Sequence, residues 1–511
     1  MNAPRIFGRP TQRPTPSLVR RMVAPALGAA SLVGATVAGC NPATFVDLAD
    51  DAPVVALGRP DGFRRTGYGT TVASIEGPLG NGALATRLAV GGGPDTGTWI
   101  YDVWNADDVG TFRISNTACE TPADDCVTGT GSAITGFPQY GGEGACLAIG
   151  EASANQVRIK CESSPGNAVA LSAGVGAALE FGFAVAGVPA GAATDARSVV
   201  LTGAPAAGSG RGTLFRIPPT GAPSELNEIV DTAGVVSGRA RLGEAIATAS
   251  LPDAATRSTS FPTVPQLGVD TPFLAAVSAP GDDRVLIVVV GVDPLNANDI
   301  DAQVLACFDG PAGFGQALVA GDVDGDGMPE VYMGFAETTT DHPGTVHVFD
   351  VADLTTLEAG CTDTTDVDDP ALTVIACPTL NGVDCVGSAF GSALALGDVN
   401  ADGTLDLIAG APRTTVEETL GAGGVFALAG SATGVDGAMA SFMRISHPGT
   451  DDRLGASVAT LRTHYGITGV TPRHEVAAGA PGANTAFIFL CSGLGDDAST
   501  TGDRCLELAT E

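Results

Sequence analysis

The chain has 511 residues, of which 44% are hydrophobic and only 16% are charged. Intrinsically disordered chains have fewer apolar and more charged residues, so this composition indicates a packed globular protein. Its 70 glycines and 33 prolines exclude a mainly helical fold and favour many short strands joined by tight turns. The net charge of −32 excludes nucleic acid and anionic lipid headgroups as direct ligands, because an acidic surface repels phosphates.

The first 40 residues have the composition of an export signal. They carry arginines and no acidic residue, and an apolar stretch from Met22 leads to Val37-Ala-Gly-Cys40. These last four residues resemble the lipobox of bacterial lipoproteins, which implies a lipid on Cys40; an ordinary secretory signal with an incidental cysteine is the alternative. No later apolar run reaches the ~20 residues that span a bilayer, so we expect membrane attachment through the lipid only. Asn41 favours the outer membrane, hence a periplasmic or cell-surface location.

The cysteine count supports export. Of the 11 cysteines, ten remain if Cys40 is lipidated, and they fall into near neighbours along the chain. Five local disulfides in an oxidising compartment explain this arrangement better than zinc, because the sequence has no Cys-x-x-Cys. The expected pairs are Cys119 with Cys126, Cys146 with Cys161, Cys307 with Cys361, Cys377 with Cys385, and Cys491 with Cys505.

A short apolar strand ending in Gly-Ala-Pro, or in a relative of it, recurs along the chain after a linker or closing strand at 41–66. Its seven copies begin at Leu88, Leu147, Leu201, Ala276, Val331, Leu407 and Val476. Six copies follow an aromatic residue or leucine with a glycine after it, at Tyr68, Phe181, Leu242, Phe314, Phe390 and Leu454. Units of about 67 residues suit four-stranded blades arranged radially, so we predict an all-β, seven-bladed β-propeller of antiparallel blades over 67–511.

This pattern resembles the FG-GAP repeat, found in the β-propeller of integrin α-subunits and in bacterial relatives. The resemblance covers nearly all of residues 67–511 and is strongest around 314–350 and 390–428. It is poor for about 100–165, which we interpret as a degenerate, disulfide-stapled second blade. A β-sandwich or two smaller β-domains are the alternative architectures, and the weak unit leaves six or eight blades open.

Two of the repeats contain an acidic loop between strands, at 322–330 and 398–406. Oxygen ligands at alternate positions, with a glycine at position 6 for the sharp turn, indicate calcium. The expected ligands are Asp322, Asp324, Asp326, Glu330 and the Met328 carbonyl in one loop, and Asp398, Asn400, Asp402, Asp406 and the Thr404 carbonyl in the other. An EF-hand is excluded because position 12 is Met333 or Ala409 instead of glutamate. We predict two calcium sites, of which the loop with four carboxylates binds more tightly.

No catalytic residue is predicted. The sequence lacks a Gly-Lys-Ser/Thr phosphate loop, a Gly-x-Ser-x-Gly elbow and a His-Glu-x-x-His motif. Integrin-like relatives hold protein partners on the propeller face, so the resemblance implies a protein-binding or scaffold module. A calcium-dependent carbohydrate-binding protein and an FG-GAP-associated hydrolase are the alternatives, and sugar binding ranks lower because only two tryptophans are available for stacking.

Overall fold

The computed structural model describes residues 54–491 apart from a set of internal segments, and every described residue belongs to one compact unit, residues 43–511. The segments left out are 59–66, 79–83, 93–97, 106–111, 117–125, 128–132, 138–144, 162–168, 173–178, 188–199, 218–222, 226–235, 253–271, 293–299, 337–342, 355–360, 364–371, 381–382, 417, 436, 438 and 464–472. Within the described part, no helix is long and apolar enough to cross a membrane.

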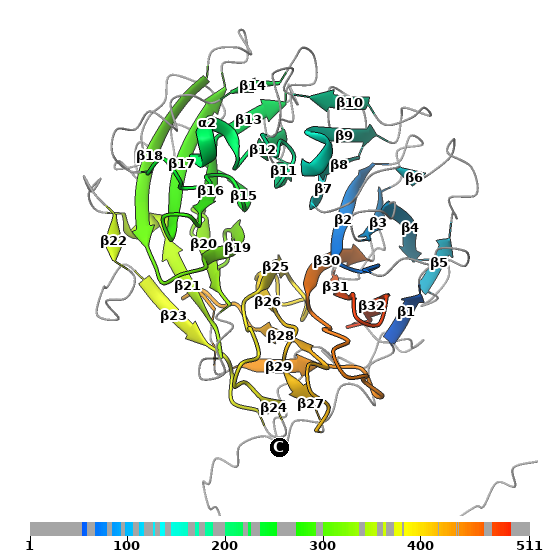
Figure 1. The fold of residues 1–511 in the computed structure, drawn as a ribbon. Coiled ribbons are helices and arrows are strands. Elements are labelled where there is room, and N and C mark those ends of the chain that lie inside the picture. The colour runs from blue at the N-terminus through cyan, green and yellow to red at the C-terminus, as the bar shows by residue number, and fades with distance from the viewer. Residues whose placement is uncertain are drawn as a thin grey trace, which may run out of the picture. The chain divides into compact units, whose positions relative to one another are not determined.

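Seven antiparallel sheets of four main strands follow one another along the chain, and we number them blade 1 to blade 7 (Figure 1). Blades 1 and 2 comprise β2 (Thr71–Pro78), β3 (Leu84–Gly91), β4 (Thr98–Asn105) and β5 (Phe112–Asn116), then β7 (Ala133–Phe137), β8 (Cys146–Glu151), β9 (Gln156–Cys161) and β10 (Val169–Ser172). Blades 3 and 4 comprise β11 (Val185–Gly187), β12 (Val200–Gly203), β13 (Leu214–Ile217) and β14 (Ser224–Glu225), then β15 (Ile246–Ser250), β16 (Phe273–Ala279), β17 (Arg284–Val292) and β18 (Ile300–Asp309).

The remaining blades follow the same order. Blades 5 and 6 comprise β19 (Phe314–Gly321), β20 (Glu330–Phe335), β21 (Thr345–Asp350) and β23 (Leu372–Ala376), then β25 (Ala393–Gly397), β26 (Asp406–Ala411), β28 (Gly424–Leu428) and β29 (Ala440–Met443). Blade 7 comprises β30 (Ser457–Thr463), β31 (Arg473–Ala480), β32 (Thr485–Phe489) and β1 (Val54–Gly58). The minor elements are β6 (Cys126–Val127) beside β4, β22 (Thr362–Asp363) beside β18, the pair β24 (Val383–Asp384) and β27 (Thr415–Val416), and the short helices η1 (Ala152–Ala154), α2 (Ala207–Gly210) and η2 (Val351–Asp353).

The first strand of each blade is the innermost, and these strands contact one another around a closed ring. Contacts run from β2 to β7, β11, β15, β19, β25 and β30 in turn, and β30 also contacts β2 (Figure 1). The ring is completed by β1, which precedes blade 1 in the chain but pairs with β32 as the outer strand of blade 7. The all-β, seven-bladed fold with four-stranded antiparallel blades is therefore confirmed.

The weak stretch of the sequence repeat divides between two blades. Strands β4 and β5 and the short β6 belong to blade 1, whereas β7 to β10 form blade 2. The described part of 41–66, Val54–Gly58, is the outer strand of blade 7.

At five of its six copies the Phe-Gly pair, or its Tyr-Gly or Leu-Gly equivalent, forms a turn just before the innermost strand, whereas Phe314 and Gly315 are the first residues of β19 itself. In blade 6, Ala389 and Gly391 flank Phe390 with φ of 58° and 84°, and the Gly391 N–H donates to the Gly410 carbonyl at 3.0 Å. Phe390 is fully buried and packs edge-on against Phe426. Because only glycine adopts this left-handed conformation at low cost, the repeat requires glycine after its buried ring.

The glycine of Gly-Ala-Pro serves a different purpose, which is close packing of neighbouring blades. A Cβ on Gly410 would lie 2.0 Å from the carbonyl oxygen of Gly455, in the turn of the next blade. Equivalent approaches of 1.8–2.0 Å occur at Gly150, Gly203, Gly334 and Gly479. The second strands of these five blades thus need glycine where the next turn crosses them.

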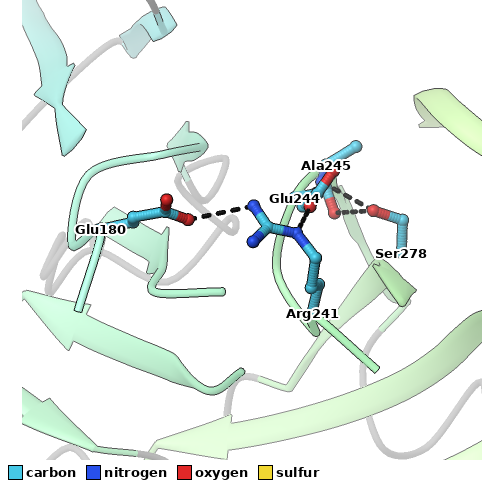
Figure 2. Close-up of polar contacts among 5 residues, drawn as sticks. All are labelled: Glu180, Arg241, Glu244, Ala245 and Ser278. Atoms are coloured by element: carbon cyan, nitrogen blue, oxygen red, sulfur yellow. Dashed lines mark hydrogen bonds and ion pairs between the residues drawn. The ribbon is translucent and has the colours of Figure 1, made fainter. Parts of the chain in front are cut away.

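The junction between blades 3 and 4 adds polar contacts at the same end of the strands (Figure 2). Arg241, before β15, donates to Glu180 of blade 3 at 3.0 Å and to Glu244 of its own blade. Ser278 replaces the repeat's glycine on β16, and its hydroxyl accepts a hydrogen bond of 2.7 Å from the Ala245 N–H. Arg241 therefore forms ion pairs with a carboxylate of each blade, and we assign it a structural role in holding blades 3 and 4 together.

Seven apolar clusters fill the seven junctions between blades in the described part of the chain. Successive side chains of a strand point to opposite faces of its sheet, so each strand serves two clusters. On β20, Val331 and Met333 pack toward blade 4, whereas Tyr332 between them packs toward blade 6. The core is therefore a ring of layers between sheets.

Three of the expected disulfides are confirmed: Cys146–Cys161, Cys307–Cys361 and Cys377–Cys385. The first joins register partners on β8 and β9 of blade 2. Cys491 is also disulfide-bonded. Cys40, Cys119 and Cys505 lie outside the described residues, as does the side chain of Cys126.

Candidate metal sites

The two acidic loops occupy the same place in neighbouring blades. The Asp322 loop (residues 322–330) joins β19 to β20 in blade 5, and the Asp398 loop (residues 398–406) joins β25 to β26 in blade 6. Each loop follows an innermost strand, whereas the Phe-Gly turn precedes it. Both loops therefore lie on one side of the ring, opposite the Phe-Gly turns.

In the Asp322 loop, backbone N–H groups turn inward and donate to the carboxylates. The bonds run from Gly325 and Gly327 to Asp322 at 2.8 and 3.1 Å, from Asp326 to Asp324 at 3.1 Å, and from Met328 to Asp326 at 2.7 Å. The loop is thus curled around its own acidic side chains, as alternate ligand positions require.

The Asp398 loop repeats this pattern. The bonds run from Asp402 and Gly403 to Asp398 at 3.1 and 3.0 Å, from Asp402 to Asn400 at 2.9 Å, and from Thr404 to Asp402 at 2.7 Å. The two loops therefore share one backbone conformation, in which the glycine at position 6 has φ of 94° at Gly327 and 93° at Gly403. No atom would lie within 4 Å of a Cβ at either glycine, so conformation and not space requires glycine there.

The carboxylate at position 9 distinguishes the loops. Glu330 is 3% exposed; its Oε2 accepts from the Val323 N–H at 2.7 Å, but its buried Oε1 has no hydrogen-bond partner in the described structure. Asp406 is fully buried, and its two oxygens accept from the N–H groups of Val399 and Gly430, both at 2.9 Å. A buried acceptor without a partner destabilises the fold by about 1–3 kcal/mol, so Glu330 carries a cost that Asp406 does not.

A further acid beside the Asp322 loop was missed by the sequence analysis. Asp350 is the last residue of β21, and the antiparallel register places it opposite Glu330. Carboxylate oxygens of Asp324, Asp326 and Asp350 lie within 4.8 Å of one another, as do those of Asp322, Asp324 and Glu330. Asp350 follows the ligand loop by twenty residues, so only the pairing of β20 with β21 brings it there.

Burial raises the pKa of the acids around both loops. The pKa of Glu330 rises to about 8 and that of Asp350 to about 6, mainly through burial, with a smaller contribution from the charge of Asp324. Burial likewise raises the pKa of Asp326, and that of Asp406 to about 7. Within the described part of the chain, no basic side chain forms an ion pair with the Asp322 loop or Asp350. Clustered hard oxygens without a countercharge suit binding of a divalent cation.

Residues 390–428 match the FG-GAP repeat family, a span that runs from the Phe-Gly turn of blade 6 through the Asp398 loop to the end of β28. Together with the seven-bladed ring, this match decides the family. The chain is an FG-GAP β-propeller. The FG-GAP propeller fold supports a protein-binding module in general.

Among solved structures, the FG-GAP propeller is similar to puromycin hydrolase, with 13% identity and a TM-score of 0.37 over 83% of this chain. It spans about half the length of that enzyme, 53%. The six-bladed, fucose-recognising lectin of Aleuria aurantia is similar over 75% of this chain and 99% of its own, with 10% identity and a TM-score of 0.35. No curated protein matches the sequence.

The remaining predicted ligands of the FG-GAP propeller differ in their surroundings. Met328 has its side chain in the apolar cluster between blades 4 and 5, and Thr404 is half-buried at the surface. Asn400 directs its amide nitrogen to Asp402 Oδ2, at 2.9 Å, so this amide is oriented by the loop itself.

His474 of blade 7 is a second residue that sequence reasoning missed. Its ring Nδ1 accepts from the Asp398 N–H at 3.0 Å, and its backbone N–H donates to the Asp398 carbonyl at 2.8 Å. Burial lowers the pKa of His474, which keeps the ring neutral and able to accept. The Asp398 loop of the FG-GAP propeller is therefore held to the next blade independently of any ion.

Proposed function

We propose that this protein is an exported, lipid-anchored FG-GAP propeller that calcium stabilises and that acts as a protein-binding module. The observation that carries the calcium proposal is the buried Oε1 of Glu330, which has no hydrogen-bond partner in the described structure. A buried carboxylate is costly unless it is paired or coordinates a metal.

The residues of the Asp322 loop fit calcium. Asp322, Asp324 and Glu330 bring carboxylate oxygens within 4.8 Å of one another, and calcium–oxygen bonds of about 2.3–2.6 Å place opposite ligands about that far apart. Asp326 and the Met328 carbonyl complete the ligand set. Calcium supplies the countercharge that the cluster lacks and stabilises only the folded state, because the unfolded chain does not assemble these oxygens.

The Asp398 loop is the second calcium site of this proposal, with Asp398, Asn400, Asp402, Asp406 and the Thr404 carbonyl as ligands. Three features support weaker binding there. The loop has one carboxylate fewer, both oxygens of Asp406 already accept backbone N–H groups, and His474 holds the loop without an ion. We therefore propose that the Asp322 loop fills first.

Export and anchoring rest on the sequence of residues 1–40 and on Cys40, which lie outside the described residues. The three disulfides of the described part support an oxidising compartment. We propose Cys40 as the lipidated residue and the outer membrane as the destination. Replacement of Cys40 by serine abolishes incorporation of labelled fatty acid if this is correct, whereas unchanged labelling contradicts the anchor.

For the binding role, the propeller displays loops from seven blades on either side of a rigid ring. The calcium loops lie on one side, so an ion there fixes the shape of that side. The partner is proposed to be a protein, and calcium is proposed to be structural.

The test of calcium is thermal unfolding of the exported chain with Cys40→Ser, in excess calcium and in chelator. We expect a rise of the melting temperature in calcium that disappears in the double variant Asp326→Ala with Asp402→Ala. No rise in the parent chain contradicts calcium binding. The same two conditions then serve for cross-linking of partners, which the binding role predicts to be stronger with calcium.

A further inference from the structure

We propose that the Asp322 loop, with Asp350 of strand β21, forms a site for two cations bridged by the carboxylate of Asp324. The first cation is that of the proposed function, and this inference rests on it. The second lies between Asp324, Asp326 and Asp350. Asp326 then serves this ion instead of the first, and Asp350 is the ligand that lies outside the repeat's pattern.

Two overlapping groups of oxygens carry the inference. Asp322, Asp324 and Glu330 form one group, and Asp324, Asp326 and Asp350 form the other. Within each group the ligand atoms lie within 4.8 Å of one another, about the span of opposite ligands around one calcium ion. Asp324 belongs to both groups, and a carboxylate has two oxygens, so it can serve one ion with each.

The charge of the cluster points the same way. Its five carboxylates carry five negative charges when ionised; one divalent cation leaves three of them uncompensated, and two leave one. None of the described basic side chains forms an ion pair with the cluster. Like charges this close destabilise one another, so a single cation is too little.

Two buried atoms independently indicate a missing ligand. Glu330 Oε1 and the Tyr332 hydroxyl have no hydrogen-bond partner in the described structure, although Glu330 is 3% exposed and Tyr332 is fully buried. They lie on the same face of β20, and Asp350 lies opposite Glu330 in the register. A hydrated cation pair would give both atoms a partner.

Blade 6 serves as an internal comparison. There β26 pairs with β28 so that Leu407 faces Leu428, and the chain continues from Leu428 to Ala429 and Gly430. The position that Asp350 occupies in blade 5 is thus taken by alanine, and the Gly430 N–H satisfies Asp406. The Asp398 loop has no second set of oxygens, so we assign it one cation.

The experiment counts calcium ions per chain by equilibrium dialysis, with calcium as the only probe. The exported chain carries Cys40→Ser and Asp402→Ala, which removes the Asp398 site. We expect two ions per chain in this background, and one after Asp350→Asn. Asparagine keeps an oxygen for the hydrogen bond from the Ala352 N–H, which Asp350 accepts at 2.7 Å, so the turn after β21 is retained.

Asp353→Asn is the matched control, because Asp353 lies in the same turn but in neither oxygen group, and two ions are expected. One ion per chain with and without Asp350→Asn overturns the cation pair while leaving calcium binding intact. No bound ion in the background chain overturns the proposed calcium function itself. Melting curves in chelator that place Asp350→Asn no lower than its parent show that a lost ion is not a folding defect.

Discussion

The substitution Glu330→Gln should stabilise the folded chain without calcium and destabilise it with calcium. Without calcium, burial raises the pKa of Glu330 from its ordinary 4.5 to about 8. Folding at pH 7 then requires the side chain to take up a proton, at a cost of about 3 kcal/mol. Glutamine removes this cost and can still accept the Val323 N–H. In calcium, the charge is a ligand, and its loss weakens the site.

The size of the effect follows from the chain length. An unfolding entropy of roughly 2 cal/mol/K per residue gives about 1 kcal/mol for each degree in a unit of this size, so 3 kcal/mol corresponds to about 3 °C. In chelator at pH 7, Glu330→Gln should melt about 3 °C above the parent chain. In saturating calcium it should melt below the parent, because stabilisation by the first cation is lost.

Scanning fluorimetry at one protein concentration and one heating rate measures both conditions. Asp406→Asn is the matched control, since Asp406 occupies the same loop position but accepts two backbone N–H groups. Asp406→Asn also removes a protonation cost, because burial raises the pKa of Asp406 to about 7. Asparagine can accept with only one of its two side-chain atoms, however, so the gain in chelator should be smaller than for Glu330→Gln. If Glu330→Gln melts below the parent chain in chelator, Glu330 stabilises the calcium-free loop, which contradicts the protonation cost assigned to it.

Three further outcomes are expected. Gly410→Ala should destabilise the chain by about 1–3 kcal/mol, because its Cβ would lie 2.0 Å from the Gly455 carbonyl oxygen. Gly58→Ala is the control and should be neutral, because no atom lies within 4 Å of a Cβ there. Equal melting temperatures of the two variants would show that neighbouring blades do not require glycine at position 410. Because burial raises the pKa of Glu330, the folded chain binds a proton that the unfolded chain has lost, so calcium-free stability should fall as the pH rises from about 5 to 8. The fall of melting temperature with pH should be shallower in Glu330→Gln. Parallel falls in the two chains would show that Glu330 is not the group that binds this proton. Gly327→Ala, at φ of 94°, should cost about 1–3 kcal/mol in backbone strain and weaken calcium binding in a titration, and an unchanged affinity would show that the loop conformation is not needed.

The parts of the fold that the sequence predicts are those encoded locally. The turn at Phe390 needs a buried ring followed by a glycine with positive φ, and Gly410 must lack a side chain where the next blade crosses it. Both requirements therefore recur as residue types in the sequence repeat. The acidic loops are equally local, because position 1 of each loop hydrogen-bonds to backbone groups within five residues.

The parts that the sequence does not predict depend on distant pairing. Asp350 joins the site through the register of β20 with β21, and His474 reaches Asp398 from the next blade, 76 residues away. Neither residue belongs to a repeated motif. The missing hydrogen-bond partner of Glu330 Oε1 could not be predicted from the sequence either. Glu330 and Asp406 occupy equivalent positions in their loops, yet both oxygens of Asp406 accept hydrogen bonds.

The strand β1 has a consequence for how the molecule would leave a membrane. Thirteen residues, 41–53, separate the proposed anchor at Cys40 from Val54, and a fully extended linker of that length reaches about 45 Å. A protease that cuts within this linker releases an intact ring, because Val54–Gly58 stays paired with β32. A cut after Gly58 instead leaves β1 covalently joined to the lipid, and the ring stays at the membrane for as long as β1 remains paired with β32. A few residues of chain thus separate a cut that frees the ring from a cut that leaves it held by the pairing of one strand.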